Sequence, residues 1–223
     1  MSYKKSIGIL FGLISCLSIA AQDDFGSILS ADVTKKIVKG LNVNFEEEIR
    51  TRSNFSEIER FSHAFDINYK PFKFLKIGGA YNPINYNHEK RGWELRHRYY
   101  FYTTGSLEAK RFTISLRERF QSTKTQGLAK TATRANPKNY LRSRLKAEYN
   151  IKNSKFTPFA FVELFNTLNN PRKNEMDEWR FAAGVDCKLD KKNAVSLYYR
   201  YQNYTDDDEM NIHYFSIAYS FKF

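Results

Sequence analysis

The sequence has little cysteine, which excludes a fold held together by disulfides. Only Cys16 and Cys187 occur in 223 residues. Cys16 lies in a leading segment that we expect to be removed, and Cys187 is then left without a partner inside the chain. A lone cysteine on an apolar strand face is typically a small buried hydrophobe. An exported protein without cysteine pairs must gain its stability from closure of a sheet instead.

Long apolar runs are also missing. After residue 21 no stretch approaches the roughly 18 apolar residues of a membrane helix. Residues 1–21 are organised as a secretory signal peptide: two lysines, an apolar run over 7–19, and cleavage sites after Ala20 or Ala21. The residues before Cys16 also resemble a lipoprotein cleavage box, so lipidation at Cys16 is the alternative.

Acidic residues are the minority. The chain has 36 Lys and Arg against 24 Asp and Glu, a net charge of +12. Loss of the signal peptide removes two lysines and leaves the chain strongly basic. A basic surplus suits nucleic acid, but export makes phosphates of lipopolysaccharide or anionic solutes the better partners. We therefore expect no nucleic-acid partner.

Aromatic residues are abundant, with 19 Phe and 15 Tyr. In residues 211–223 they alternate with small or polar residues, and this period of two predicts a β-strand. The chain stops on the aromatic face, as the final strand of an outer-membrane barrel does. We read Phe215, Tyr219, Phe221 and Phe223 as the C-terminal signal that the barrel-assembly machinery recognises during biogenesis.

The same alternation predicts ten strands of about 9–12 residues, the first beginning near Leu41. We therefore predict an all-β fold in which residues 22–223 form one antiparallel up-and-down transmembrane β-barrel, with about 10 strands and 12 as the alternative. Phe156 to Phe165 is apolar at both parities, so its faces stay unassigned. Residues 25–37 form an eleventh strand-like stretch. Because we expect an even count with both termini on one side, this stretch should be lumenal or split, unless the count is wrong elsewhere.

Connections of two lengths predict the orientation. Short turns are expected near residues 71, 105, 153 and 191, and longer loops at 52–57, 83–92, 122–138, 166–178 and 203–210. Outer-membrane barrels have short periplasmic turns and longer outside loops. We therefore expect the loops outside and both ends of the barrel chain in the periplasm, in the outer membrane of a Gram-negative cell envelope.

The arginines share the parity opposite to the apolar residues, and all fall toward the predicted outer ends of their strands. This lumen cluster comprises Arg50, Arg96, Arg98, Arg117, Arg119, Arg142, Arg144, Arg180 and Arg200, with Arg52 and Arg60 in the same pattern. Guanidinium groups grip carboxylates and phosphates bidentately, and a ring of fixed positive charge selects anions.

Acidic residues of the same parity give the alternative, a structural ion-pair network. They are Glu46, Glu48, Asp66, Glu94, Glu148 and Asp186. Because the interior of a small barrel is filled by side chains, polar groups there need internal partners. Two further acids, Glu47 and Glu118, fall on apolar faces, and either a β-bulge or a position at the membrane boundary would account for them.

Catalysis has little support. His63, His97 and His213 fall on the apolar parity, His88 lies in a predicted loop, and the candidate nucleophile Ser115 has lumen parity. A hydrolase needs serine, histidine and an acid within reach of one another. No metal-ligand spacing occurs either. We expect no enzymatic activity, no catalytic residues, no metal and no cofactor.

Several segments resemble the bacterial β-barrel family called "domain of unknown function 2490" over roughly residues 25–223. They are Glu46–Arg52, Arg117–Phe120, Tyr140–Leu145, Glu163–Asn166, Trp179–Asp186 and His213–Phe215. The resemblance implies an outer-membrane barrel and supplies no reaction.

The function expected from the sequence is that of a monomeric, non-enzymatic outer-membrane barrel in contact with lipid and lipopolysaccharide. It would be either a narrow anion-favouring pore or a structural or binding barrel with an arginine-lined lumen. The alternatives are an outer-membrane lipid-modifying enzyme, or a lipid-anchored or periplasmic barrel that binds a small ligand.

Overall fold

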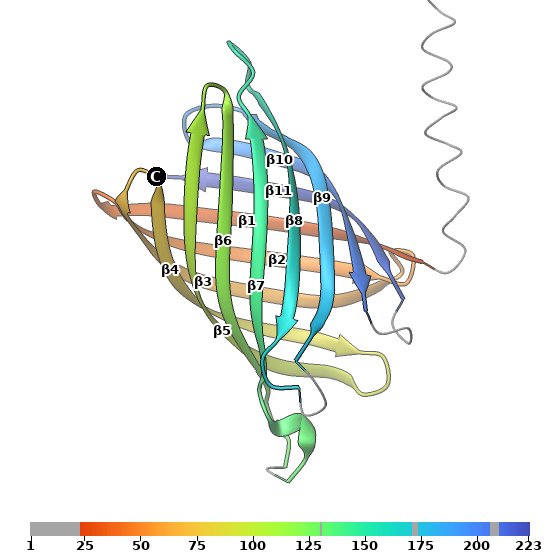
Figure 1. The fold of residues 1–223 in the computed structure, drawn as a ribbon. Helices are drawn as coiled ribbons and strands as arrows, with labels where there is room; N and C mark the ends of the chain where they lie inside the picture. The colour runs from red at the N-terminus through yellow and green to blue at the C-terminus, as the bar shows by residue number, and fades with distance from the viewer. Residues whose placement is uncertain (1–22, 130, 171–173, 206–209) are drawn as a thin grey trace, which may run out of the picture.

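The computed structural model describes residues 23–129, 131–170, 174–205 and 210–223, so the predicted signal peptide lies outside the described residues. In this part of the chain eleven strands form one closed barrel (Figure 1). They are β1 (Asp24–Val38), β2 (Leu41–Arg52), β3 (Glu57–Phe72), β4 (Leu75–His88), β5 (Gly92–Ala109), β6 (Phe112–Thr125), β7 (Lys138–Tyr149), β8 (Phe156–Thr167), β9 (Met176–Lys188), β10 (Asn193–Tyr204) and β11 (Ile212–Lys222). A single 3-10 turn, η2 (Thr133–Ala135), lies between β6 and β7. None of the helical turns in the described ranges is long and apolar enough to cross a membrane.

Sequential neighbours around the barrel are antiparallel, and β1 closes it by pairing in parallel with β11. This register runs from Asp24 opposite Ile212 to Thr34 opposite Lys222. The predicted all-β up-and-down barrel is confirmed, with one strand more than the ten expected. The stretch 25–37 is part of the wall as β1, so the expectation that it is lumenal or split is wrong. An odd number of strands can close because one parallel pair is enough.

The start of β1 and the end of β11 lie at opposite ends of the barrel. We call the end with Phe223 and the β3–β4 turn the turn end, and the end with residues 53–56, 126–129 and 131–137 the loop end (Figure 1). The carboxylate of Asp24 accepts hydrogen bonds from the backbone N–H groups of Ser53 and Asn54, both at 2.8 Å, so β1 begins at the loop end. At the turn end, the N–H of Phe223 donates to the carbonyl of Thr34 at 3.1 Å. The expectation that both ends share one side is therefore wrong.

The strands extend further than their apolar alternation predicts. Pairing of β4 with β5 continues to His88 opposite Gly92, which reduces the predicted loop 83–92 to residues 89–91. At the turn end, residues 150–155 form a longer connection than this one. Polar residues at the rim of the loop end remain hydrogen-bonded in the sheet, which shortens the connections there. The length of a connection alone therefore does not show at which end of the barrel it lies.

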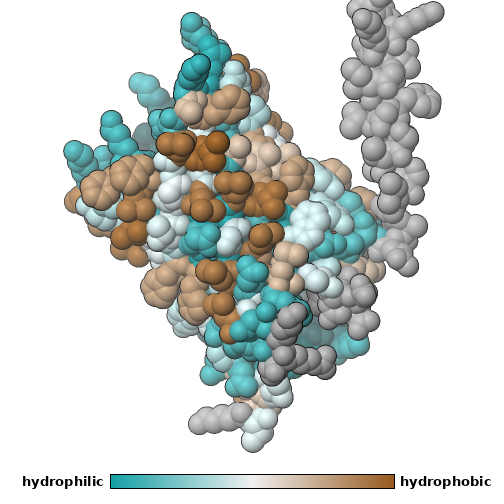
Figure 2. All heavy atoms as spheres, in the orientation of Figure 1, coloured by the Kyte–Doolittle hydropathy of each residue, from teal (hydrophilic) through white to brown (hydrophobic). Residues whose placement is uncertain are grey.

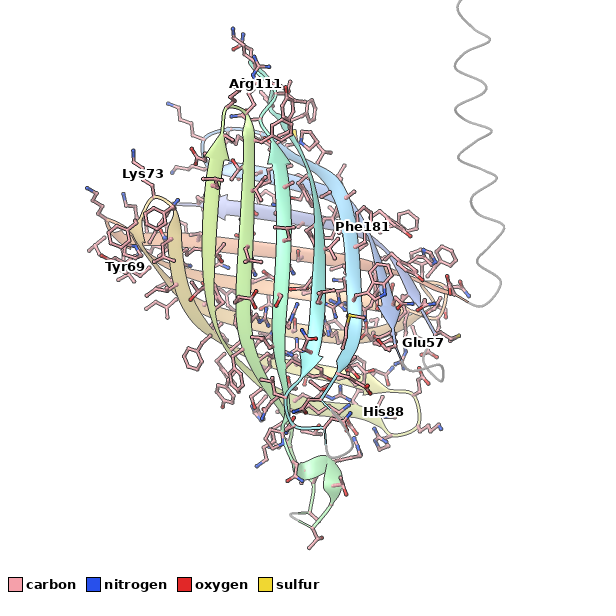
Figure 3. The ribbon with its side chains drawn as sticks, viewed as in Figure 1. Glu57, Tyr69, Lys73, His88, Arg111 and Phe181 are labelled. Carbon is pink, nitrogen blue, oxygen red and sulfur yellow. The ribbon has the colours of Figure 1, made fainter. Side chains whose placement is uncertain are left out.

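The two faces of the wall differ as the alternation predicts. Outward side chains such as Leu197 and Phe215 are exposed, whereas Tyr214 and Ile28 on the inward face are almost fully buried. Figure 2 shows hydrophobic side chains over the middle of the face in view. In Figure 3 the side chains of Tyr69 and Phe181 point away from the barrel, while Lys73 and Arg111 mark the turn end and Glu57 and His88 the loop end. Of the predicted assembly signal, Phe215, Tyr219 and Phe223 are exposed on the outer surface.

Glu47 and Glu118 face outward in continuous strands. The register of β2 and β6 with their neighbours has no shift at either residue, so of the two explanations given above a bulge is excluded. Each carboxylate instead has a partner on the outer surface. Glu47 Oε2 lies 2.5 Å from Nδ1 of His63, and Glu118 accepts a hydrogen bond from the Ser143 hydroxyl at 2.7 Å.

Candidate functional site

All eleven arginines of the predicted set occupy inward-facing positions. Arg50, Arg142 and Arg200 are 2%, 5% and 6% exposed, while Leu141, the outward neighbour of Arg142, is 38% exposed. The structure places Arg96, Arg98, Arg117, Arg119, Arg144 and Arg180 on the same face, with Arg52 and Arg60. Because one face of each strand is apolar and faces outward, each of these guanidinium groups lies on the opposite face and points into the lumen.

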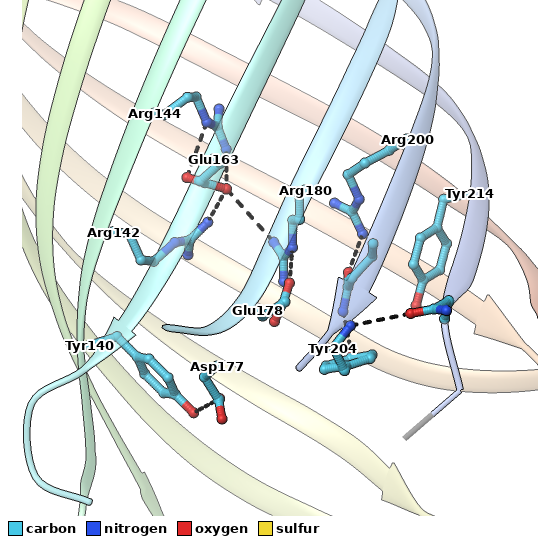
Figure 4. A network of polar contacts seen from close by, with 12 residues as sticks. Tyr140, Arg142, Arg144, Glu163, Asp177, Glu178, Arg180, Arg200, Tyr204 and Tyr214 are labelled. Carbon is cyan, nitrogen blue, oxygen red and sulfur yellow. Dashed lines mark hydrogen bonds and ion pairs between the residues drawn. The ribbon is translucent and has the colours of Figure 1, made fainter. Parts of the chain in front are cut away.

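Glu163 on β8 is the centre of one ion-pair cluster (Figure 4). Its carboxylate accepts a hydrogen bond from Arg142 at 2.8 Å and two from Arg144 at 3.1 and 3.0 Å. Arg180 approaches to 3.9 Å and also bonds to Glu178. The Glu163 side chain is only 2% exposed. Three arginines therefore share one buried carboxylate.

A second cluster lies where β2 and β3 pair. Glu48 bonds both Arg50 at 3.0 Å and Arg60 at 2.9 Å. Glu59 lies 3.7 Å from Arg50 and accepts a hydrogen bond from the Tyr214 hydroxyl at 3.1 Å. Glu59 has the parity of an outward residue, but the β2–β3 register shifts between Arg50 and Thr51, and Glu59 is buried.

At the rim of the loop end, Glu94 fixes the longest connection. It bonds Arg91 at 2.8 Å, Arg96 at 3.2 Å and Arg134 of η2 at 2.9 Å. Nearby, Arg52 pairs with Glu57 at 3.3 Å and with Glu89 at 3.7 Å. The contact between Arg134 and Glu94 holds η2 against the mouth of the barrel.

Four inward arginines make no ion pair with any carboxylate of the described residues: Arg98, Arg117, Arg119 and Arg200. Arg98 donates to the Thr123 hydroxyl, and Arg119 and Arg200 donate to glutamine side chains. Nε of Arg117, Arg119 and Arg200 is buried without a hydrogen-bond partner in the same part of the chain. Three of the four belong to β5 and β6, so uncompensated positive charge concentrates on that arc of the wall.

Aromatic rings lie beneath the guanidinium groups. Arg119 is centred 3.5 Å above Tyr100, Arg96 3.6 Å above Tyr86, and Arg142 4.1 Å above Phe165. Such stacking is favourable and leaves the N–H edges of the guanidinium free to bind. The lumen therefore combines cation faces held by aromatic rings with donor edges directed into the interior.

The acids predicted to pair with these arginines do so only in part. Glu48 and Glu94 pair with arginines, and Glu148 pairs with Lys146 at 2.9 Å. Asp66 bonds Asn68, and Asp186 accepts from Ser196. Glu46 makes no ion pair among the described residues.

Strand alternation did not predict three of the acids that matter most: Glu59, Glu163 and Glu178. Glu178 precedes the predicted start of its strand, and the register shift hides Glu59. For Glu163 a signal was present, because Thr157, Glu163 and Thr167 share one parity in a stretch whose other residues, apart from Asn166, are apolar.

The histidines lie apart from the lumen. His97 bonds Tyr81 at 2.6 Å and Gln126 at 2.9 Å, and His213 bonds Tyr199 at 2.5 Å, all on the outer surface. Ser115 faces inward on β6. The structure therefore does not bring Ser115 and these histidines together. No group of histidine, cysteine and acidic residues in the described ranges could hold a metal ion.

Comparison with known proteins adds the family and the fold. A NanC porin, solved in a rhombohedral crystal form, matches with a TM-score of 0.57 and 15% identity over 90% of this chain and 99% of that one. A bacterial polysaccharide outer membrane secretin matches with a TM-score of 0.53 and 7% identity, over 81% of this chain. The match spans 63% of the secretin chain, and identities this low concern the fold alone.

The sequence itself finds no match among curated proteins. It does match a family model over residues 25–212, which is most of the barrel. The chain belongs to the family described as "Protein of unknown function (DUF2490)".

Proposed function

We propose that this protein is a non-enzymatic outer-membrane barrel whose narrow lumen favours anions. One observation carries the proposal: eleven arginines face the lumen, and Arg98, Arg117, Arg119 and Arg200 make no ion pair with a carboxylate of the described residues. Fixed positive charge in a confined, low-dielectric space raises the local concentration of anions and repels cations.

The width of the barrel is compatible with a narrow passage. Eleven strands about 4.8 Å apart and tilted by about 40° give a backbone radius of about 11 Å. That lies between eight-stranded barrels, which side chains fill, and sixteen-stranded porins with open water channels. Some aromatic side chains lie along the wall: the Tyr102 ring packs over Gly78, where an added Cβ would be 2.5 Å from its Cζ.

The outer surface supports membrane insertion. Outward side chains such as Leu107, Phe101 and Phe65 are 69%, 68% and 53% exposed, and a monomer in water would leave this apolar band uncovered. A transmembrane strand needs about 9–11 residues, and all eleven strands reach that length. We place the turn end with its C-terminal aromatic residues in the periplasm and the loop end outside. Lipid, lipopolysaccharide and, during biogenesis, the assembly machinery are the partners this implies for a monomer.

Ion-pair clusters favour a second candidate, a structural or binding barrel with a filled lumen. Glu163 and Glu48 each form ion pairs with more than one arginine, as internal partners of a plugged interior would. The two candidates differ in their ion conductance, because a barrel with a filled lumen conducts no current.

Single-channel recording of the refolded protein in a planar bilayer separates the two. Under an asymmetric KCl gradient, an anion-favouring pore shifts the reversal potential toward the chloride equilibrium potential. Replacing Arg98, Arg117, Arg119 and Arg200 together by glutamine should abolish this selectivity, while a control at the turn end, Lys110→Gln with Arg111→Gln, should keep it. Cation selectivity, or no conductance from a barrel shown to be folded, would overturn the proposal.

A further inference from the structure

Two directly opposed arginine pairs lie side by side on β6 and β7. In the register of these strands Arg117 is opposite Arg144, and Arg119 is opposite Arg142. Like charges directly opposite each other on one face of a sheet are destabilising. We call these four residues the arginine block.

A similar pair elsewhere in the barrel is neutralised within the protein. Arg50 is opposite Arg60 on β2 and β3, Glu48 bonds both of them, and Glu59 lies 3.7 Å from Arg50, so two carboxylates balance the two arginines. In the arginine block, Glu163 bonds Arg142 and Arg144 only, and Arg117 and Arg119 have no ion pair with a described carboxylate. The block therefore keeps a net charge of +3 when Glu163 is counted.

Neighbouring side chains hold the block together. The amide oxygen of Gln121 accepts hydrogen bonds from Arg119 at 2.9 Å and from Arg142 at 2.8 Å. Arg117 lies over Tyr102 at 5.4 Å and Arg144 over Phe161 at 4.4 Å. With Tyr100 and Phe165 under the other two, each guanidinium is supported by a ring. Nε of Arg117, Arg119 and Arg142 is buried without a partner in the described structure. The charges are thus fixed close together instead of spreading apart.

One more acid acts on the block at longer range. Glu46 on β2 interacts electrostatically with Arg119 without forming an ion pair, and it also interacts with Asp32, Glu48 and Asp66. No ion pair of the described residues therefore joins Glu46 to the block.

From this geometry we infer that the arginine block is a binding site for a phosphate-type oxyanion with two or more negative charges. Several oxygens on one compact centre match the bidentate geometry of two guanidinium forks, whereas a chloride ion offers one atom and one charge. The block lies on the inward face near the middle of β6 and β7, so the ligand is a soluble anion of the lumen and not a lipid headgroup. The inference deepens the proposed function and rests on it in one respect: the lumen must admit the anion from one end.

Equilibrium binding of pyrophosphate to the detergent-solubilised full barrel tests the site. Isothermal titration calorimetry in phosphate-free buffer, at an ionic strength held constant with KCl, should show saturable binding. Arg117→Gln with Arg119→Gln should weaken it by about tenfold or more, since charge-assisted hydrogen bonds are lost. Lys110→Gln with Arg111→Gln removes the same charge at an exposed turn and should leave it unchanged. Glu163→Gln raises the charge of the block and should strengthen binding.

A lysine variant and a lipid competitor extend the test. Arg117→Lys with Arg119→Lys keeps the charge without the planar fork and should give intermediate affinity, which covers the case in which the glutamine variant does not fold. Phosphatidic acid in the micelle should not displace pyrophosphate; displacement would assign the site to lipid phosphate. Absence of saturable binding by the folded wild-type barrel, or equal affinity in the Arg117→Gln/Arg119→Gln variant, would overturn the inference. Both of these binding results could occur in a barrel that still conducts anions selectively. Failure of the binding site is therefore distinguishable from failure of the proposed pore.

Discussion

Glu163→Gln is the most informative stability test, because this carboxylate is the ion-pair partner of both Arg142 and Arg144. It is 2% exposed and accepts three hydrogen bonds of 2.8 to 3.1 Å. Removing one partner of a buried ion pair typically destabilises a protein by about 3–5 kcal/mol, since the remaining charge is left uncompensated. Glutamine keeps the volume and one acceptor oxygen, so we expect a loss of about 3 kcal/mol, at the lower end of this range.

Equilibrium unfolding by urea in lipid vesicles, followed by tryptophan fluorescence, measures the change. The matched control is Glu57→Gln, which breaks an ion pair with Arg52. The Glu57 side chain is 51% exposed. An exposed pair contributes about 0–1 kcal/mol. Equal losses in the two variants would refute the reasoning, because they would mean that water solvates the arginines around Glu163 as well as it solvates those at the rim. Pyrophosphate should restore part of the loss in Glu163→Gln if the arginine block binds it.

Two further predictions concern the wall and the orientation. Gly78→Ala places a Cβ 2.5 Å from the ring of Tyr102, so the ring must move away from the wall. We expect lower single-channel conductance and a loss of stability of about 1–3 kcal/mol. The control Gly105→Ala has open space around the added Cβ and should change neither quantity. An epitope inserted after Thr133 at the loop end should bind antibody on intact cells. An epitope inserted after Lys152 at the turn end should bind antibody only after the outer membrane is permeabilised. The reverse pattern would contradict the proposed orientation.

Alternation along a strand predicts which residues face inward, but it does not predict which residues of neighbouring strands are paired. The period of two assigns each arginine to a face from its neighbours alone, which is why Arg117 and Arg142 could be placed in the lumen. That Arg119 stands opposite Arg142 depends on register, which is set by turns and by closure of the whole sheet. The parallel closure of β1 with β11 joins segments from the two ends of the chain, and no local pattern specifies it.

Irregular positions account for the other differences. The β2–β3 register shift buries Glu59, although its parity predicts an outward position. Polar rim residues such as Asn87 and His88 are paired in β4, although nothing in their hydropathy distinguishes them from a loop. In both cases hydrogen bonds between strands decide the structure, and side-chain periodicity does not report them.

A structural ion-pair network and an anion site occupy different arcs of the same wall. On β2 and β3, opposed arginines have Glu48 between them, and on β9 Arg180 pairs with Glu178. On β5 and β6, Arg98, Arg117 and Arg119 have aromatic rings, hydroxyls and amides as partners but no paired carboxylate among the described residues. Rings and neutral dipoles can hold a guanidinium in place without cancelling its charge. The β5–β6 arc therefore keeps a positive potential that an anion from solution can use, while the neutralised arcs make the barrel stable enough to tolerate it.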